Sequence, residues 1–318
     1  MKLVALAALC ALLLPPLAMS DDMPHSADIS KRNLKPGDFP RWQKLARDVY
    51  AYEGLHSPDK QGVIVNTVSL IVITGEGVVV VDGQGDVPQT QLMIQNIGKL
   101  TPQPIKYVVI ASDHSDHVGG NAAFKEAYPN VVFIASPASK KTLAGKPNPP
   151  TMLVSDQRSL RMDGMQIEIL NLGRAHTGGD LVAWLPESNV LFLGEVYLRD
   201  VFPAMRSAFP SEWIETLRKA ATMNAAWYIP GHGFIDEAPV MRRELDEARR
   251  ALAYVIDEAK RLREAGYTCE SAANCSAVEH ADWGPYDDWA LRSSQAPLAI
   301  WKVYQELDGK LAPAGDVR

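Results

Sequence analysis

Residues 107–120 read YVVIASDHSDHVGG and join an apolar run to a turn that contains two histidines. The first five of these residues are aromatic, β-branched or small and apolar, a composition that predicts a short buried strand. The strand runs directly into a turn in which His114, Asp116 and His117 fall within four residues. The paired glycines at 119 and 120 let the backbone fold closely around a small centre. Since polar side chains at a strand end lie on the rim of a sheet, the turn predicts a functional site at that rim.

Two more turns of the same kind follow along the chain. Residues 175–180 read AHTGGD after one predicted strand, and residues 230–233 read PGHG after another. A single histidine in a turn is more often a surface or core residue than a ligand. Three such turns in one chain favour a metal site, because imidazole and carboxylate ligands together suit zinc, and also iron or manganese.

Short strands and helices alternate between these turns. The glycines at 75 and 77 predict a hairpin. The alternation predicts mixed sheets covered by helices rather than a regular parallel βαβ series. The expected strands are 63–65, 68–74, 78–81, 107–111, 131–135, 166–172, 181–185, 190–193 and 227–229, and the expected helices are 88–100, 121–128 and 211–225.

The chain changes character after Pro239. Apolar residues from Met241 to Leu262 recur at helical spacing and predict a long amphipathic helix, and a second helix is expected over 291–307. We therefore expect a domain over 46–236 followed by a C-terminal helical extension over 237–318.

The first twenty residues have the pattern of a secretory signal peptide. Lys2 is followed by an apolar run, by Pro15-Pro16 and by small residues up to Ser20. A buried N-terminal helix is the alternative. We expect residues 1–20 to be removed, 21–45 to be a loosely ordered polar leader, and the protein to be periplasmic or secreted. Removal leaves Cys269 and Cys275, which predict a disulfide, with two free buried thiols as the alternative.

The composition excludes several classes of protein. The 318 residues are 47% hydrophobic and 22% charged, which is ordinary for a globular protein. With 32 basic and 38 acidic residues the net charge is −6, and no basic stripe invites a nucleic acid. After the N-terminal run, no stretch is long and apolar enough for a membrane span. A small-molecule substrate is the partner we expect.

The order of the motifs resembles the metallo-β-lactamase superfamily. HSDHVGG from His114, HTGGD from His176 and PGHG around His232, with Val81-Asp82-Gly83 upstream, carry the resemblance over about residues 60–235. It implies an αββα sandwich of two mixed sheets, with the metals in a cleft along one edge of both sheets. It does not fix the substrate, because this fold hosts lactam, thioester, lactone, sulfate-ester and phosphodiester hydrolases.

The chain departs from the family pattern at Ser112, which stands where the family's first motif has its leading histidine. The resemblance then implies a first metal site that retains only His114 and His176 as imidazole ligands, with Ser112 as a neighbour rather than a ligand. The second site keeps Asp116, His117 and His232. Three protein ligands with one open position are typical of a catalytic zinc.

A second departure is Glu195, where many relatives have an aspartate that bridges two metals. We list Glu195 among the ligands, although the sequence leaves open whether it binds one metal, bridges two, or only accepts a hydrogen bond. Asp82 and Asp180 are candidates for holding ligand imidazoles in one tautomer. The alternative for both is turn chemistry, in which the carboxylate accepts backbone N–H bonds.

The expected chemistry is hydrolysis at one or two zinc ions. A metal held by Asp116, His117 and His232 would lower the pKa of a bound water and supply hydroxide for attack on a cyclic amide or ester, a β-lactam among them. Asp116 is the expected catalytic residue, orienting the water and taking its proton. The alternative is a catalytically silent metal-binding or interaction module with a degenerate first site. All three second-site ligands are present, and this favours the hydrolase.

Overall fold

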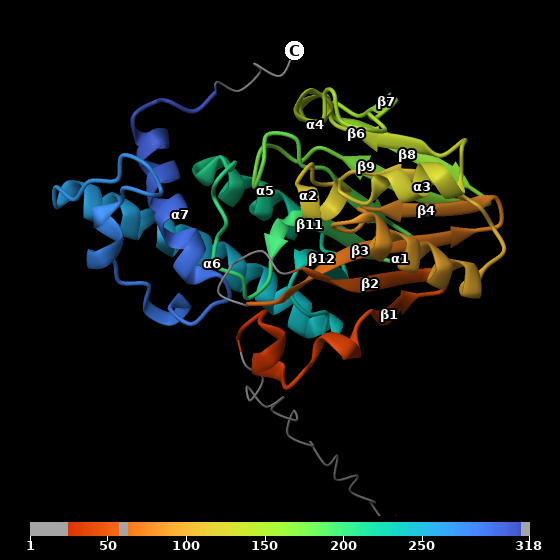
Figure 1. Cartoon of the computed structure of the whole chain (residues 1–318), viewed down its shortest axis with the longest axis horizontal. Helices are drawn as coiled ribbons and strands as arrows, with labels where there is room; N and C mark the ends of the chain where they lie inside the picture. Colours follow the sequence, from red (N-terminus) through yellow and green to blue (C-terminus); the bar gives the residue numbers. More distant parts are fainter. Residues whose placement is uncertain (1–24, 57–62, 313–318) are drawn as a thin grey trace, which may run out of the picture.

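The computed structural model describes residues 25–56 and 63–312. Two β-sheets lie face to face, with helices on both outer faces (Figure 1). This arrangement is the αββα sandwich of mixed sheets that the sequence predicts, and the C-terminal helices follow it. The predicted signal peptide at 1–20 and the first residues of the leader lie outside the described residues.

The first sheet has seven strands in the order β1-β2-β3-β4-β5-β6-β7. Its first four strands are antiparallel and form hairpins, whereas β4 to β7 run parallel. The strands are β1 (Arg41–Ala46), β2 (Val49–His56), β3 (Val65–Thr74), β4 (Gly77–Val81), β5 (Ile105–Val109), β6 (Val132–Ala135) and β7 (Met152–Leu153).

The second sheet has five strands in the order β12-β11-β10-β9-β8. Only β11 and β12 are parallel, so both strands end at the same edge of the sheet. The strands are β8 (Gln157–Met162), β9 (Met165–Leu170), β10 (Val182–Leu185), β11 (Val190–Leu198) and β12 (Trp227–His232).

The helices bury apolar stripes against the outer faces of the sheets. On the first sheet, α1 contributes Met93 and Ile97 and α3 contributes Phe124 to a cluster with Val80 and Ile105. On the second sheet, α5 and α6 pack against β11 and β12. The helices are α1 (Val87–Leu100), α2 (Ser115–Val118), α3 (Asn121–Ala127), α4 (Pro137–Thr142), α5 (Pro210–Thr222), α6 (Ala238–Glu264) and α7 (Arg292–Leu307), with 3₁₀ turns η1 (Ile29–Arg32), η2 (Pro36–Asp38), η3 (Ser276–His280) and η4 (Gly284–Tyr286).

The expectation of a loosely ordered leader over 21–45 is wrong for its last five residues. Strand β1 covers residues that we assigned to the leader and pairs antiparallel with β2. It is an edge strand with charged residues, which local composition does not distinguish from a loop. Tertiary contacts fix it instead, because the Trp42 ring packs edge-on against Tyr50 and Tyr52. The predicted run 68–74 and the last residue of the run 63–65 belong to one strand, β3, while residues 63 and 64 precede it. Strands β2, β7 and β8 were not predicted.

The C-terminal part confirms two expectations. The long helix α6 and the last helix α7 lie close to the predicted positions, and Cys269 and Cys275 form the expected disulfide. Within residues 25–56 and 63–312, no helix combines the length and hydropathy needed to cross a membrane.

Candidate metal centre

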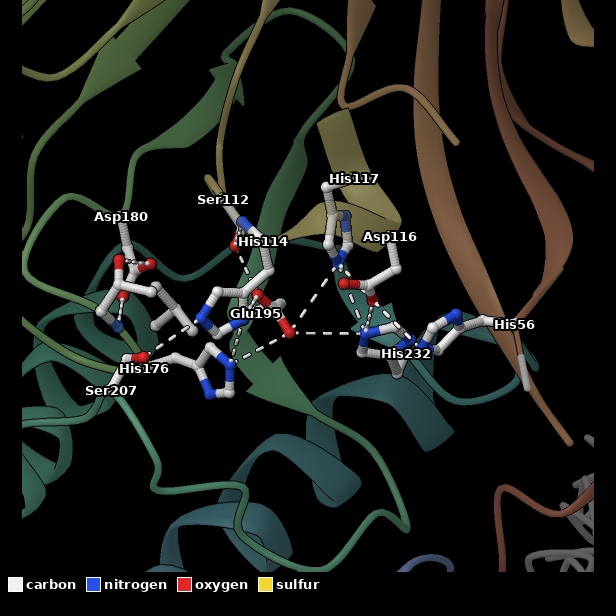
Figure 2. A network of polar contacts seen from close by, with 12 residues as sticks. His56, Ser112, His114, Asp116, His117, His176, Asp180, Glu195, Ser207 and His232 are labelled. Carbon is white, nitrogen blue, oxygen red and sulfur yellow. Dashed lines mark hydrogen bonds and ion pairs between the residues drawn. The ribbon is translucent and has the colours of Figure 1, made fainter. Parts of the chain in front are cut away.

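All the predicted metal ligands meet at one edge of the sandwich (Figure 2). His114 caps α2, which follows β5 and carries Asp116 and His117. His176 lies in the loop between β9 and β10, and His232 is the last residue of β12. Because the strands end at this edge, residues far apart in the sequence are brought within contact distance of one another.

Four donor atoms form the first cluster, which we call the four-donor group: Asp116, His117, Glu195 and His232. All four side chains are buried. The His232 Nε2 atom lies 3.0 Å from Asp116 Oδ2, 3.3 Å from His117 Nε2 and 3.4 Å from Glu195 Oε1. In a tetrahedral zinc site with bonds near 2.1 Å, ligand atoms are about 3.4 Å apart. The spacing therefore fits a single metal ion.

Three donor atoms form the second cluster, the three-donor group: His114, His176 and Glu195. His176 Nε2 lies 3.1 Å from His114 Nδ1 and 3.0 Å from Glu195 Oε1. His114 Nδ1 lies 2.9 Å from Glu195 Oε2. The two groups thus share Glu195, whose Oε1 faces imidazoles of both groups while its Oε2 faces His114 (Figure 2).

The Ser112 side chain is directed at Glu195. Its hydroxyl donates a short hydrogen bond to Glu195 Oε2, and Ser112 is fully buried. The two positions at which the sequence departs from the family pattern are therefore in direct contact. Serine fixes the longer carboxylate where the family pattern has an imidazole.

A distortion of β11 brings Glu195 to this position. Gly194 has φ = +52°, and the β11–β12 register shifts on both sides of it. A Cβ at Gly194 would lie 3.2 Å from Ala111 Cβ, so both the dihedral angle and the close packing favour glycine here. Irregularities of this kind redirect a side chain at the edge of a sheet.

Two polar groups orient the imidazoles of the four-donor group. His232 Nδ1 lies 2.7 Å from the backbone oxygen of Asn66 and donates to it, which leaves the lone pair on Nε2. His117 Nδ1 lies 3.1 Å from Asp82 Oδ2, an ion-pair distance, although neither atom makes a well-aligned hydrogen bond within the described residues. The Nε2 atoms of both rings then face each other with lone pairs, and such an arrangement requires a metal ion or a proton between them.

Asp180 does not have the role predicted for it. Its Oδ2 accepts the Thr177 backbone N–H at 2.7 Å and its Oδ1 accepts the Thr177 hydroxyl at 2.5 Å. This is the alternative turn chemistry, which shapes the HTGGD loop. The Nδ1 atom of His176 is buried and has no hydrogen-bond partner in the described part of the chain.

The charges of the four-donor group change the pKa values of its members. Burial opposes the charged form of His117, yet Asp116, Asp82 and Glu195 raise its pKa to about 9. Burial also opposes the charge on His232, but hydrogen bonds and charges from Asp116 and Glu195 raise its pKa to about 10. Burial alone would raise the pKa of Glu195, but the surrounding imidazoles hold it well below its usual range. The four-donor group therefore keeps its carboxylates charged beside a positive charge, which is either a protonated imidazole or a metal ion.

Two further residues lie at this site and were not predicted from the sequence. His56, at the end of β2, has its Nε2 atom 3.8 Å from Asp116 Oδ2, and its ring lies 5.9 Å from that of His232. The Asn66 side chain accepts the Gly233 N–H at 2.7 Å and so holds the turn that carries His232. Neither residue lies in a glycine-flanked turn, so only the pairing of β2 with β3 could have indicated them.

The donors open into a cavity of about 300 Å³. One wall belongs to the C-terminal extension, through Leu291, Gln295 and Leu298. A larger cavity of about 740 Å³ continues on the side of the three-donor group and shares His114 and Arg206 with the first. The two cavities leave room for a substrate much larger than its reacting group.

Comparison with known proteins supports the interpretation of this site as a metal centre. A family profile described as the metallo-beta-lactamase superfamily matches residues 62–232. The chain is 26% identical over 183 residues to a metallo-beta-lactamase type 2 of Bacillus cereus, covering 56% of this chain and 71% of that protein. It is 25% identical over 217 residues to the type 2 enzyme of Bacteroides fragilis, covering 65% and 84%. A solved metallo-beta-lactamase from Pontibacter korlensis is similar in fold, with a TM-score of 0.61 and 21% identity over 68% of this chain and 99% of that one.

Proposed function

The chain belongs to the metallo-β-lactamase superfamily and is a metal-dependent hydrolase of that family, and from this premise we propose that it is an exported zinc enzyme which hydrolyses a cyclic amide or ester, such as a β-lactam. The observation that carries the proposal is the position of Glu195. Its carboxylate supplies a donor to both groups, so the loss of one imidazole at Ser112 does not leave the three-donor group short of a third ligand.

The donor sets fit zinc at both positions. Asp116, His117, His232 and Glu195 would hold one ion, and His114, His176 and Glu195 the other. Nitrogen and carboxylate donors in sets of three or four are typical of zinc. The facing lone pairs of His117 and His232 fit a cation between them, since the Asn66 carbonyl and Asp82 engage the opposite ring nitrogens.

Zinc bound here would lower the pKa of a bound water toward neutrality and polarise a substrate oxygen. The chain's own residues supply the rest of the chemistry. Asp116 contacts the neighbouring imidazoles through Oδ2, so Oδ1 can orient a water and accept its proton. His56, 3.8 Å from Asp116 Oδ2, lies beside this carboxylate at the cavity wall.

Two observations support a small-molecule substrate with a strained or activated carbonyl. Four relatives that are matched over 70–84% of their own length, those of Bacillus cereus and Bacteroides fragilis among them, are named metallo-beta-lactamases. The two adjoining cavities of about 300 and 740 Å³ accommodate a ring at the donors and a side chain beyond it. Export is supported by the composition of residues 1–20 and by the Cys269–Cys275 disulfide.

The rival function, a silent metal-binding module, requires a site that has lost its organisation. The buried hydrogen bond from Ser112 to Glu195 argues against decay, because it joins both departures from the family pattern into one ordered unit. Decay would leave a buried carboxylate without such a partner.

The decisive experiment measures zinc per chain by elemental analysis and hydrolysis of lactam, lactone, thioester and sulfate-ester substrates, with and without a chelator. We expect more than one zinc per chain and chelator-sensitive hydrolysis of a lactam or lactone. Less than about a tenth of a metal ion per chain at micromolar protein, after addition of zinc, would contradict the proposal. Chelator-sensitive hydrolysis of thioesters or sulfate esters alone would contradict the proposed cyclic amide or ester substrate, but not the proposed zinc centre.

A further inference from the structure

A separate cluster of possible ligands lies where the N-terminal segment meets the second sheet. It consists of His25, Asp200 and Glu244, which we call the His25 cluster. Asp200 follows β11, and Glu244 lies in the second turn of α6. The Asp200 backbone oxygen accepts N–H bonds from Ala27 and Ala290, so the N-terminal segment and the residues before α7 meet at this aspartate.

Both carboxylates are buried, and in each of them one oxygen faces an arginine and the other faces His25. Asp200 Oδ2 lies 3.7 Å from Arg199 Nε and 3.9 Å from an Arg32 nitrogen. Glu244 Oε1 lies 3.4 Å from Arg243 Nε. The other oxygen of each carboxylate, Asp200 Oδ1 and Glu244 Oε2, is directed toward His25.

These two inward oxygens have no hydrogen-bond partner among the described residues, although the side chains are only 2% and 3% exposed. Such buried unpaired oxygens are uncommon and point to an ion or a water that satisfies them. Burial raises the pKa of Glu244, and the charge of Asp200 raises it further. The two carboxylates therefore destabilise each other unless a positive charge lies between them.

The spacing of the cluster indicates what kind of charge fits. His25 Nδ1 lies 3.7 Å from Asp200 Oδ1 and 3.7 Å from Glu244 Oε2. A charged imidazole N–H bonded to a carboxylate is found at about 2.7–2.9 Å, so this nitrogen is too far from both oxygens for a good hydrogen bond. Ligand atoms around a tetrahedral zinc are about 3.4 Å apart, which is close to the observed spacing.

The surrounding charges leave room for a cation. Two guanidinium groups, Arg32 and Arg199, face three carboxylates, because Asp236 lies 3.0 Å from Arg32 and 2.7 Å from Arg199. With Asp200, Glu244 and the half-exposed Arg243, the set has three negative and three positive charges, but the arginines contact the outer oxygens, Asp200 Oδ2 and Glu244 Oε1, rather than the two inward ones. The Tyr197 hydroxyl is buried and has no hydrogen-bond partner in the described chain. Burial raises its pKa, and the charges of Asp200 and Glu244 raise it further.

We propose that His25, Asp200 and Glu244 bind a further divalent metal ion, zinc or manganese, at a site separate from the centre that contains Glu195. One imidazole and two carboxylates suit either ion. Since His25 is half exposed, water can reach the ion and complete its coordination. The ion would join the N-terminal segment to β11 and α6.

The test counts metal ions in the full chain after dialysis against micromolar Zn²⁺ or, separately, Mn²⁺. The wild-type chain should retain one more ion than Glu244→Gln with at least one of the two metals. Glu264→Gln makes the same change at an exposed position near the end of α6 and should retain the wild-type number. Equal counts for wild type and Glu244→Gln with both metals would overturn the proposal and leave a proton on His25 as the balancing charge.

A second variant covers the case in which Glu244→Gln does not fold. His25→Ala removes a half-exposed side chain and should fold, lose the same ion, and show a smaller metal-induced rise in Tm than the wild type. An identical rise in Tm, with an unchanged metal count, would also overturn the proposal. Because each result is a difference from wild type, it does not depend on whether the centre around Glu195 is loaded or active.

Discussion

The four-donor and three-donor groups share one carboxylate but differ in how their imidazoles are held. In the four-donor group, His117 and His232 are buried and each has a polar neighbour at the opposite ring nitrogen. In the three-donor group, the buried Nδ1 atom of His176 has neither a carboxylate nor a hydrogen-bond acceptor beside it among the described residues, and His114 is partly exposed at the cavity. Partners of this kind fix the tautomer and the direction of the ligand lone pair.

This difference indicates unequal roles. The four-donor group has a preorganised set of donors, which favours tight binding of one metal ion. The three-donor group has fewer donors, looser support and direct access to the larger cavity. We therefore expect the four-donor group to load first and the three-donor group to depend more strongly on the zinc concentration.

The largest effect should come from the residue that the groups share. Glu195→Gln keeps the shape of the side chain but removes the charge that faces both groups. Zinc affinity should fall by more than about 100-fold at each, because even a partner of a ligand is worth about 10–100-fold. Hydrolysis should fall with it. The measurement is zinc competition against a chromophoric chelator.

The matched control is Glu187→Gln, the same change at an exposed residue shortly before β11. It should leave zinc binding and hydrolysis unchanged. If Glu195→Gln weakened only one group, the shared-carboxylate interpretation would be wrong.

The next effect is the pH dependence of zinc binding at the four-donor group. In the metal-free chain the pKa values of His117 and His232 are about 9 and about 10. Zinc must displace these protons near neutral pH, so its affinity should rise by about tenfold per pH unit for each proton released. Calorimetric titration in buffers of different ionisation enthalpy counts the protons.

Unfolding of the metal-free chain gives the complementary measurement. Both pKa values lie above the unfolded value of about 6.5. The stabilisation from these two histidines is therefore fully present below that pH and is lost as the pH rises through about 9 to 10. Zinc should reverse the trend between neutral pH and pH 9. A metal-free Tm that increased over this range would contradict the pKa assignment.

The smallest effect should separate Asp82 from Asp180, the two aspartates for which the sequence predicts the same role. Asp82→Asn removes the charge beside His117 and should weaken zinc binding at the four-donor group by about 10–100-fold. Asp180→Asn retains an acceptor oxygen for Thr177 and should leave zinc affinity nearly unchanged. Equal losses in both variants would show that the two groups are supported in the same way.

Local patterns were sufficient to predict mixed sheets covered by helices and a metal site in the glycine-flanked turns, whereas the αββα sandwich was implied by the resemblance of the motif order to the family. Glycine-flanked turns after apolar strands are visible in any window of about ten residues. Strand β1 was not predictable in this way. It is an edge strand with charged residues, and aromatic contacts with β2 hold it in place.

The relation between Ser112 and Glu195 lies beyond local patterns for a physical reason. The two residues are 83 positions apart, and their contact depends on the irregularity at Gly194 and on the packing of β11 beside the end of β5. Read separately, each residue looks like a weakened ligand position. His56 and Asn66 were missed for a similar reason, because strand pairing alone brings them to the donors.

The wall that the C-terminal extension contributes to the smaller cavity has a consequence for how this enzyme could diversify. All six donor residues lie within residues 62–232, the stretch that matches the family, whereas Leu291, Gln295 and Leu298 lie outside it. The residues that would hold the metal and one wall of the smaller cavity are thus encoded in separate stretches of one chain, whereas the larger cavity is lined within the matched stretch. Exchange of the helical tail would reshape the smaller cavity while every donor keeps its position. Two homologues with identical motifs and different tails would then differ in the shape of the space beside their donors.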